Sequence, residues 1–442
     1  MLKKQIISFV KFVIPLFLCV LIAILLATLL LTAVYMIPEQ KIINNVKLSA
    51  NILKEEGTYP QVFQWCTSKL DNFTDAIMLT SAAYEGEKSE IVNAMEVTRG
   101  AVARTGSPTN SMFAHYVEGK PFDIVSAYPR YWHGYLVFLK PLLSIMDYST
   151  IRVINLVFQL LLSLIIVCLL KKKNMKEYII PYIISYVFLM PFVLAKSLQY
   201  STCYYIMAVT CIVILLVQNK LENKALYIFL VAGIATAFFD FLTYPIATFG
   251  VPAVMYFCLQ KNKGIKEPLF KLTKILFSWG LGYFGMWFGK WAIASIVTQE
   301  NMFLDAAAAM EVRNGYAEAS RESIILLEII VAIGKNVVRF LNTPVTLFAV
   351  ILVVMYAVMV HKKQKKEQTS LKTVVIFCLP FIVLASLPIV WYSFLLNHST
   401  THSIFTNKAL VVTAFAVMCA TIKCYKEDRG RFSVLTDDSQ SD

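Results

Sequence analysis

The sequence predicts an all-α polytopic membrane protein with about ten transmembrane helices, a helical outer segment after the first span, and interfacial helices. Hydrophobic residues make up 58% of the 442 residues, whereas a soluble domain is closer to half apolar. Several apolar runs reach about 20 residues with few charges, which is the length that crosses a bilayer core. Short lysine-rich stretches separate these runs, and consecutive stretches leave room for two spans.

The lysine-rich stretches predict the orientation of the chain. They lie at residues 171–173, 220–224, 261–266, 362–366 and 423–431. Loops that carry Lys and Arg stay in the cytoplasm during insertion, so we expect all five on that side. The net charge of +13 then belongs to cytoplasmic loops, and no nucleic-acid partner is expected. The predicted location is the plasma membrane, with both termini cytoplasmic and the active site on the outer face.

The sequence predicts that the chain consists of four consecutive segments. Residues 1–36 are the first transmembrane span, because their apolar run is too long for a signal-peptide core of about 7–15 residues. Residues 37–150 form an outer-face segment, which over 37–130 carries eleven acidic and nine basic residues. Residues 151–422 form a multi-span transmembrane bundle, and residues 423–442 a cytoplasmic tail.

Within these segments, apolar spacing predicts the individual elements. Helices are expected near residues 51–56 and 87–103, and residues 128–147 are predicted to lie on the membrane surface as an interfacial helix, because aromatic rings suit that belt. Residues 324–341 carry three charges and are predicted as a second interfacial or partly buried helix. The nine later spans are expected at about residues 151–170, 178–197, 202–218, 225–240, 244–260, 272–297, 343–361, 371–392 and 408–422.

Two carboxylates of the outer segment, Asp71 and Asp75, are the candidate catalytic residues. Four residues apart, they would share one helical face. Paired carboxylates can bind a divalent cation or divide acid and base roles. The alternative is two solvated acids beside a capping turn at residues 72–74. No cofactor is predicted with certainty, and a divalent cation is possible.

Several cationic and polar residues are candidate substrate-binding groups. Arg130 and His133 lie in an aromatic run at 128–134, where Arg can pair with a phosphate; the alternative is an ordinary interfacial anchor. Asp240 ends an apolar span, so it is either a functional acid or a simple cap. Lys290 lies about 10 Å inside its span and must pair or face a polar cavity.

Small residues and histidines complete the candidate set. Gly282, Gly285 and Gly289 form a face that allows close helix packing. His398 and His402 are four apart in the last outer loop, close to Lys408. These two histidines could bind a metal, or a phosphate or sugar hydroxyl; the alternative is a polar turn between two spans.

The order of these features resembles the GT-C class of polytopic glycosyltransferases. The resemblance rests on the large outer segment with an early acidic cluster, the interfacial helix and the many spans with short loops. The run from Asn397 to Lys408 is similar to the late outer loop of uncharacterised bacterial members, where an Arg often stands in place of Lys408. In that class the key acid follows the first span closely, whereas Asp71 lies about 35 residues beyond it.

The resemblance implies sugar transfer on the outer face from a polyprenyl-phosphate donor to a cell-envelope glycan or lipid, with Asp71 or Asp75 as the base. Membrane lipid is the other expected partner. Two alternatives remain open: a flippase or transporter of lipid-linked saccharides, and a glycan polymerase. A transporter would more often show matching halves with broken helices, and the chain shows none.

Overall fold

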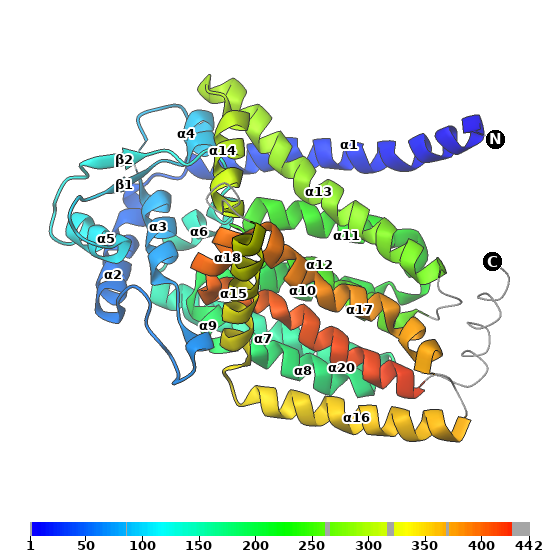
Figure 1. Cartoon of the computed structure of the whole chain (residues 1–442). Helices are drawn as coiled ribbons and strands as arrows, with labels where there is room; N and C mark the ends of the chain where they lie inside the picture. The colour runs from blue at the N-terminus through cyan, green and yellow to red at the C-terminus, as the bar shows by residue number, and fades with distance from the viewer. Residues whose placement is uncertain (1, 85, 261–265, 316–321, 368–370, 427–442) are drawn as a thin grey trace.

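The computed structural model describes residues 2–84, 86–260, 266–315, 322–367 and 371–426 (Figure 1). Most of these residues are helical, and the described part contains one two-stranded sheet. The predicted basic loop at 261–265 and most of the predicted tail at 423–442 lie outside the described residues.

Within the described residues, six helices contain a stretch long and apolar enough to cross a membrane. The predicted class, a helical multi-pass membrane protein, is therefore confirmed. Five of these stretches lie within α1 (Leu2–Tyr35), α7 (Tyr148–Lys172), α10 (Leu198–Leu216), α16 (Val345–Glu367) and α17 (Leu371–Phe394). The sixth, Ser403–Lys426, consists of α20 (Val411–Lys426) and the short helical turns that lead into it.

Further helices pack among these six. They are α8 (Ile179–Phe188), α9 (Pro191–Lys196), α11 (Leu221–Phe239), α12 (Ile246–Leu259) and α13 (Lys266–Thr298), with short 3-10 turns η2 (Lys176–Tyr178) and η3 (Gln218–Lys220). The predicted span at 178–197 is divided between α8 and α9. The helix ends before Pro191, which lacks a backbone N–H and restricts the residue before it, and Met190 has a φ of 58°.

The predicted small-residue face of α13 is confirmed as a packing surface. A Cβ on Gly282 would lie 2.3 Å from the Leu230 carbonyl oxygen of α11. On the same helix, added Cβ atoms at Gly285 and Gly289 would lie 2.7 Å from Val20 and 2.4 Å from Ile24 of α1. The three glycines therefore let α13 approach both α11 and α1 closely.

The outer segment folds as short elements at one end of the bundle (Figure 1). They are α2 (Gln40–Glu56), η1 (Cys66–Ser68), α3 (Asn72–Ala83), α4 (Glu90–Glu96), β1 (Arg99–Ala101), α5 (Pro108–Tyr116), β2 (Ile124–Ser126) and α6 (Leu136–Leu143). The expected helix at 87–103 was only partly correct, because the chain turns at Val97 (φ 45°) and continues as β1, paired antiparallel with β2.

The predicted interfacial helix at 128–147 was also only partly correct. Helix α6 covers its middle, but residues 128–135 are not helical. Tyr131, Trp132 and His133 are buried rather than spread on a surface. The Trp132 indole N–H donates to the Met286 carbonyl of α13 at 2.7 Å, so tertiary packing draws this segment into the fold.

A second set of helices, all short except α15, covers the same end of the bundle. It contains α14 (Met302–Asn314), α15 (Glu322–Leu341), α18 (Leu396–Thr401), α19 (Ser403–Thr406) and the 3-10 turn η4 (Asn407–Leu410). Helix α15 covers the second predicted interfacial stretch. The lysine-bearing ends of α13, α16 and α20 lie at the opposite end of the bundle (Figure 1).

Candidate functional site

A cavity of about 930 Å³ opens between the outer segment and the second set of helices. Its walls come from α3, the 128–135 segment, α14, α15 and α18. Five of the nine predicted site residues, from three different parts of the chain, contribute to its lining: Asp71, Arg130, His133, His398 and His402.

Asp71 presents the predicted catalytic carboxylate to this cavity. It is the N-cap of α3, accepting from the Thr74 N–H at 3.1 Å and the Thr74 hydroxyl at 2.8 Å. Its own backbone N–H donates to the Ser197 hydroxyl at 3.1 Å. Burial raises the pKa of Asp71 to about 6, against the lowering effect of the two Thr74 hydrogen bonds. Such a carboxylate is ionised near neutral pH but remains a useful proton acceptor.

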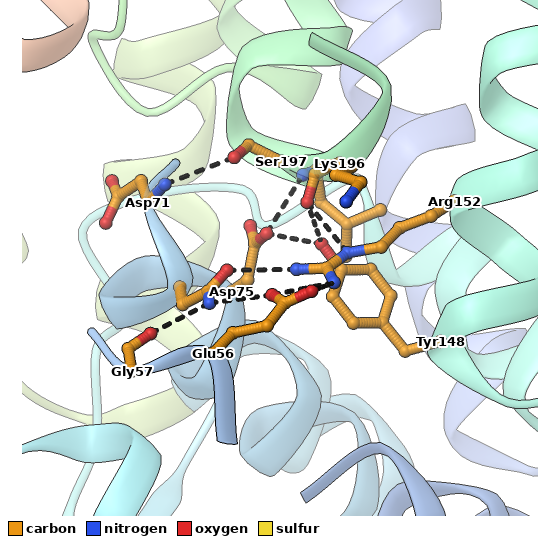
Figure 2. A network of polar contacts seen from close by, with 10 residues as sticks. Glu56, Gly57, Asp71, Asp75, Tyr148, Arg152, Lys196 and Ser197 are labelled. Atoms are coloured by element: carbon orange, nitrogen blue, oxygen red, sulfur yellow. Dashed lines mark hydrogen bonds and ion pairs between the residues drawn. The ribbon is translucent and has the colours of Figure 1, made fainter. Parts of the chain in front are cut away.

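Asp75 lies outside the cavity lining and is fully buried; Figure 2 shows its polar contacts, with Tyr148 among the partners. Its carboxylate accepts a hydrogen bond from the Tyr148 hydroxyl and from the Leu198 N–H at 3.3 Å, at the first turn of α10. Burial raises the pKa of Asp75 to about 7, and the Tyr148 hydrogen bond opposes this rise. Asp75 thus supplies an acceptor to the free N–H groups of a helix start, which is a structural role.

A buried guanidinium, Arg152, joins the outer segment to the bundle (Figure 2). Its Nη1 lies 2.8 and 2.9 Å from the two Glu56 carboxylate oxygens, and its Nη2 donates to the Asn72 side-chain oxygen at 2.9 Å. Its Nε donates to the Lys196 carbonyl at 2.9 Å. The sequence-based predictions omitted Arg152, although an Arg near the start of an apolar run was a usable signal.

Arginines and tyrosines form one wall of the cavity. Arg130 makes a bidentate ion pair with Asp305 of α14, at 2.7 and 2.8 Å. This pairing raises the pKa of Arg130 and lowers the pKa of Asp305. Arg99 lies over the Tyr128 ring at 5.4 Å and Arg313 over the Tyr131 ring at 5.5 Å. These rings hold the cations at the wall without neutralising them.

The cavity histidines are neutral hydrogen-bonding groups. His133 Nε2 lies 2.9 Å from the Tyr128 carbonyl oxygen, and His398 Nε2 lies 2.9 Å from the Leu242 carbonyl oxygen. A carbonyl only accepts, so each Nε2 carries the proton. Burial lowers the pKa of both rings to about 3, and it also lowers the pKa of His402.

The two histidines of the last outer loop lie together, with ring centroids 4.9 Å apart. Among the described residues, no three His, Cys, Asp or Glu side chains gather in a way that could hold a metal ion.

Besides Asp75, three predicted site residues do not line the cavity. The Asp240 carboxylate accepts from the Thr243 N–H at 3.1 Å and closes the turn after α11. Lys290 donates to the Met95 carbonyl at 2.9 Å, and Lys408 to the Leu189 carbonyl at 3.4 Å. All three side chains satisfy backbone groups of turns or helix ends.

Four cationic residues of the cavity wall were not among the predicted site residues: Lys69, Arg99, Arg313 and Arg339. All come from segments that we predicted to be outside the membrane or at its surface. No local motif marks them, because they come from four segments that meet only in the fold.

An apolar groove of about 970 Å³ runs along the flank of the bundle beside the cavity. Side chains of α6, α7, α10 and α11 line it, and on α10 the lining extends from Leu198 to Val213. These fifteen steps span about 22 Å at 1.5 Å per residue, most of a hydrocarbon core of about 30 Å. Tyr135 lines both the groove and the cavity.

Comparisons with protein-family models, curated proteins and solved structures find no match for this chain.

Proposed function

We propose that the protein transfers a sugar from a polyprenyl-phosphate donor to a cell-envelope glycan or lipid, with the cavity as the active site. The observation that carries this proposal is the cavity's position next to the apolar groove, with Tyr135 in both. An amphiphile with a phosphate head fits this pair of sites: the cationic wall suits the phosphate, and the apolar groove suits a long isoprenoid tail.

The proposal includes the topology of the chain. Ten segments cross the plasma membrane: the six long apolar helices, the α8–α9 pair, α11, α12 and α13. Helix α13 has 33 residues, more than the roughly 20 that a span needs. The lysine-bearing ends of α7, α16 and α20 face the cytoplasm. The N-terminus and the end of α20 lie on that side, and the cavity opens on the outer face.

The chemistry divides between a base and a cationic wall. Asp71 accepts the proton of the acceptor hydroxyl as its oxygen attacks the anomeric carbon of the donor sugar. The bond between that carbon and the phosphate oxygen breaks, and its electron pair leaves with the polyprenyl phosphate. Arg99 and Arg313 stabilise the charge that develops on this leaving group. The neutral histidines hydrogen-bond sugar hydroxyls, and tyrosine rings of the wall pack against the sugar.

The test is sugar transfer by the full chain in proteoliposomes, from polyprenyl-phosphate sugars to extracted envelope acceptors. Asp71→Asn should reduce transfer by about a hundredfold or more, the scale of lost general base catalysis. Asn caps a helix as well as Asp does, so the variant should remain folded. Glu55→Gln, an exposed acid on α2, is the matched control and should transfer at the wild-type rate.

Asp75→Asn separates the two acids in the same assay. We expect a lower melting temperature and near-normal transfer per folded molecule, because Asp75 supports the start of α10. Full transfer by Asp71→Asn would exclude it as the base. Movement of lipid-linked sugar across the bilayer without any transfer would favour a flippase instead.

A further inference from the structure

We propose that the cavity contains a second anion-binding subsite, formed by Lys69 and Arg339, which binds a phosphate-bearing acceptor. This inference rests on the proposed function, because it names the acceptor's chemistry at the same site. It predicts that the envelope polymer or lipid that receives the sugar is itself negatively charged.

The first argument is the charge of the cavity. Five cationic side chains (Lys69, Arg99, Arg130, Arg313 and Arg339) and two carboxylates (Asp71 and Asp305) line it, so its formal charge is +3. Arg130 is paired with Asp305. Across the described part of the chain, no carboxylate forms an ion pair with any of the other four cations. One phosphate monoanion leaves most of this charge unmatched.

The second argument is that the cations form two separate groups. Arg99, Arg130 and Arg313 gather at Tyr128 and Tyr131: Arg99 and Arg130 lie over the first ring and Arg313 over the second. Lys69 and Arg339 belong to other elements, the end of η1 and the last turn of α15.

Contacts between η1 and α15 bring the second group together. The Cys66 N–H donates to the Asn342 side-chain oxygen at 2.8 Å, and the Cys66 thiol lies 4.0 Å from the Arg339 carbonyl oxygen. Lys69 directly follows η1, and its backbone bridges to Gln61. Both cationic side chains therefore reach the cavity from a joined pair of elements.

The third argument assigns each group to a substrate. The arginine group lies beside the groove, because Tyr131 and the groove-lining Tyr135 both pack on the Phe241 ring, at 5.4 and 5.1 Å. A donor whose tail lies in the groove would place its phosphate there. Lys69 is instead two residues before Asp71, so an anion bound by Lys69 and Arg339 would hold its hydroxyl near the base.

The experiment measures binding by the full chain in lipid nanodiscs, without turnover. The probes are a glycerol-phosphate oligomer, a neutral oligosaccharide of similar length, and a long-chain polyprenyl phosphate. The variants are Lys69→Gln, Arg339→Gln and Arg313→Gln, with Lys47→Gln as the matched control, since Lys47 is an exposed cation of α2.

Removing one charged hydrogen-bond donor should weaken binding of the anion about tenfold. We expect Lys69→Gln and Arg339→Gln to reduce the affinity for the glycerol-phosphate oligomer by this factor and to leave the affinity for polyprenyl phosphate unchanged. Arg313→Gln should reduce the affinity for polyprenyl phosphate and leave the affinity for the oligomer unchanged. Lys47→Gln should change neither affinity. The neutral oligosaccharide should bind more weakly than the charged oligomer and respond to none of the variants.

Two results would overturn the proposal. If the wild-type protein binds the charged oligomer no better than the neutral one, the cavity has no anion-binding subsite for the acceptor. Equal loss of polyprenyl phosphate binding in Arg339→Gln and Arg313→Gln would assign both groups to the donor. The binding comparison needs no sugar transfer, so it can fail or succeed separately from the proposed enzymatic activity.

Discussion

Two carboxylates one helical turn apart on α3 show how far identical side chains can differ in role. Asp71 faces the cavity and caps its own helix, whereas Asp75 faces the first turn of α10 and the Tyr148 hydroxyl. Burial raises the pKa of both. Of the two, only Asp71 lines the cavity, so the pH dependence of the proposed transfer should report Asp71.

We expect an acid limb in the rate of transfer near pH 6. Asp71 must be ionised to accept a proton, and its raised pKa of about 6 keeps it protonated at a pH where an ordinary aspartate is already charged. Below this pKa, kcat/KM should fall about tenfold per pH unit. The measurement is kcat/KM from about pH 4.5 to about pH 8 in proteoliposomes. A limb near pH 4 would mean that Asp71 is not the base or is not buried during turnover.

At the scale of elements, buried lysines close the ends of helices. Four lysine ammonium groups each donate to a carbonyl at or just beyond the C-terminal end of a helix, which has no partner within that helix. A cation there is also favoured by the helix dipole. The pairs are Lys140 with Ala82, Lys290 with Met95, Lys408 with Leu189, and Lys423 with Phe257. Helix ends therefore account for Lys290 and Lys408 without a substrate.

Close helix packing is the second feature at this scale. Gly282→Ala should destabilise the protein by about 1–3 kcal/mol, the usual cost of overpacking, because its Cβ would lie 2.3 Å from the backbone oxygen of Leu230. Gly280→Ala is the matched control, since the nearest atom to its added Cβ is 3.9 Å away. Thermal unfolding in one detergent would compare them. Equal melting temperatures would show that α11 and α13 can separate at little cost.

At the scale of the whole molecule, the lysine-bearing helix ends and the cavity lie at opposite ends of the bundle. Lysines mark the ends of α7, α16 and α20. The elements that line the cavity lie at the end of the bundle opposite to the lysine-bearing ends of α16 and α20 (Figure 1). The apolar groove runs along the flank between these two ends. Under the proposed function, this arrangement would let one amphiphilic substrate contact the cavity while its tail remains in the groove.

The proposed topology predicts which residues an impermeant thiol reagent can reach. In a background whose nine native cysteines are replaced by Ser, Asp123→Cys should be labelled in intact cells. Gln364→Cys, beside the lysines that end α16, should be labelled only after the membrane is permeabilised. Labelling in the opposite order would place the cavity in the cytoplasm and remove the basis for an outer-face reaction.

The sequence by itself determined the class of the molecule and the positions of its long apolar helices. Both depend on hydrophobic length and local charge, which act along the chain before any packing occurs. It also indicated the small-residue face of α13 and five of the residues that line the cavity, because polar groups concentrate in segments outside the apolar runs.

Only the tertiary structure decided which polar groups share a site. Lys69, Arg99, Arg313 and Arg339 come from four separate segments, and no local pattern indicates that they meet. The difference between Asp71 and Asp75 depends on Tyr148 and α10, which follow them by more than seventy residues. Lys290 looked like an unpaired charge in a span until folding brought the end of α4 to it. Long-range contacts determine the partners of polar groups. These partners distinguish the polar groups that line the cavity from those that satisfy buried backbone groups.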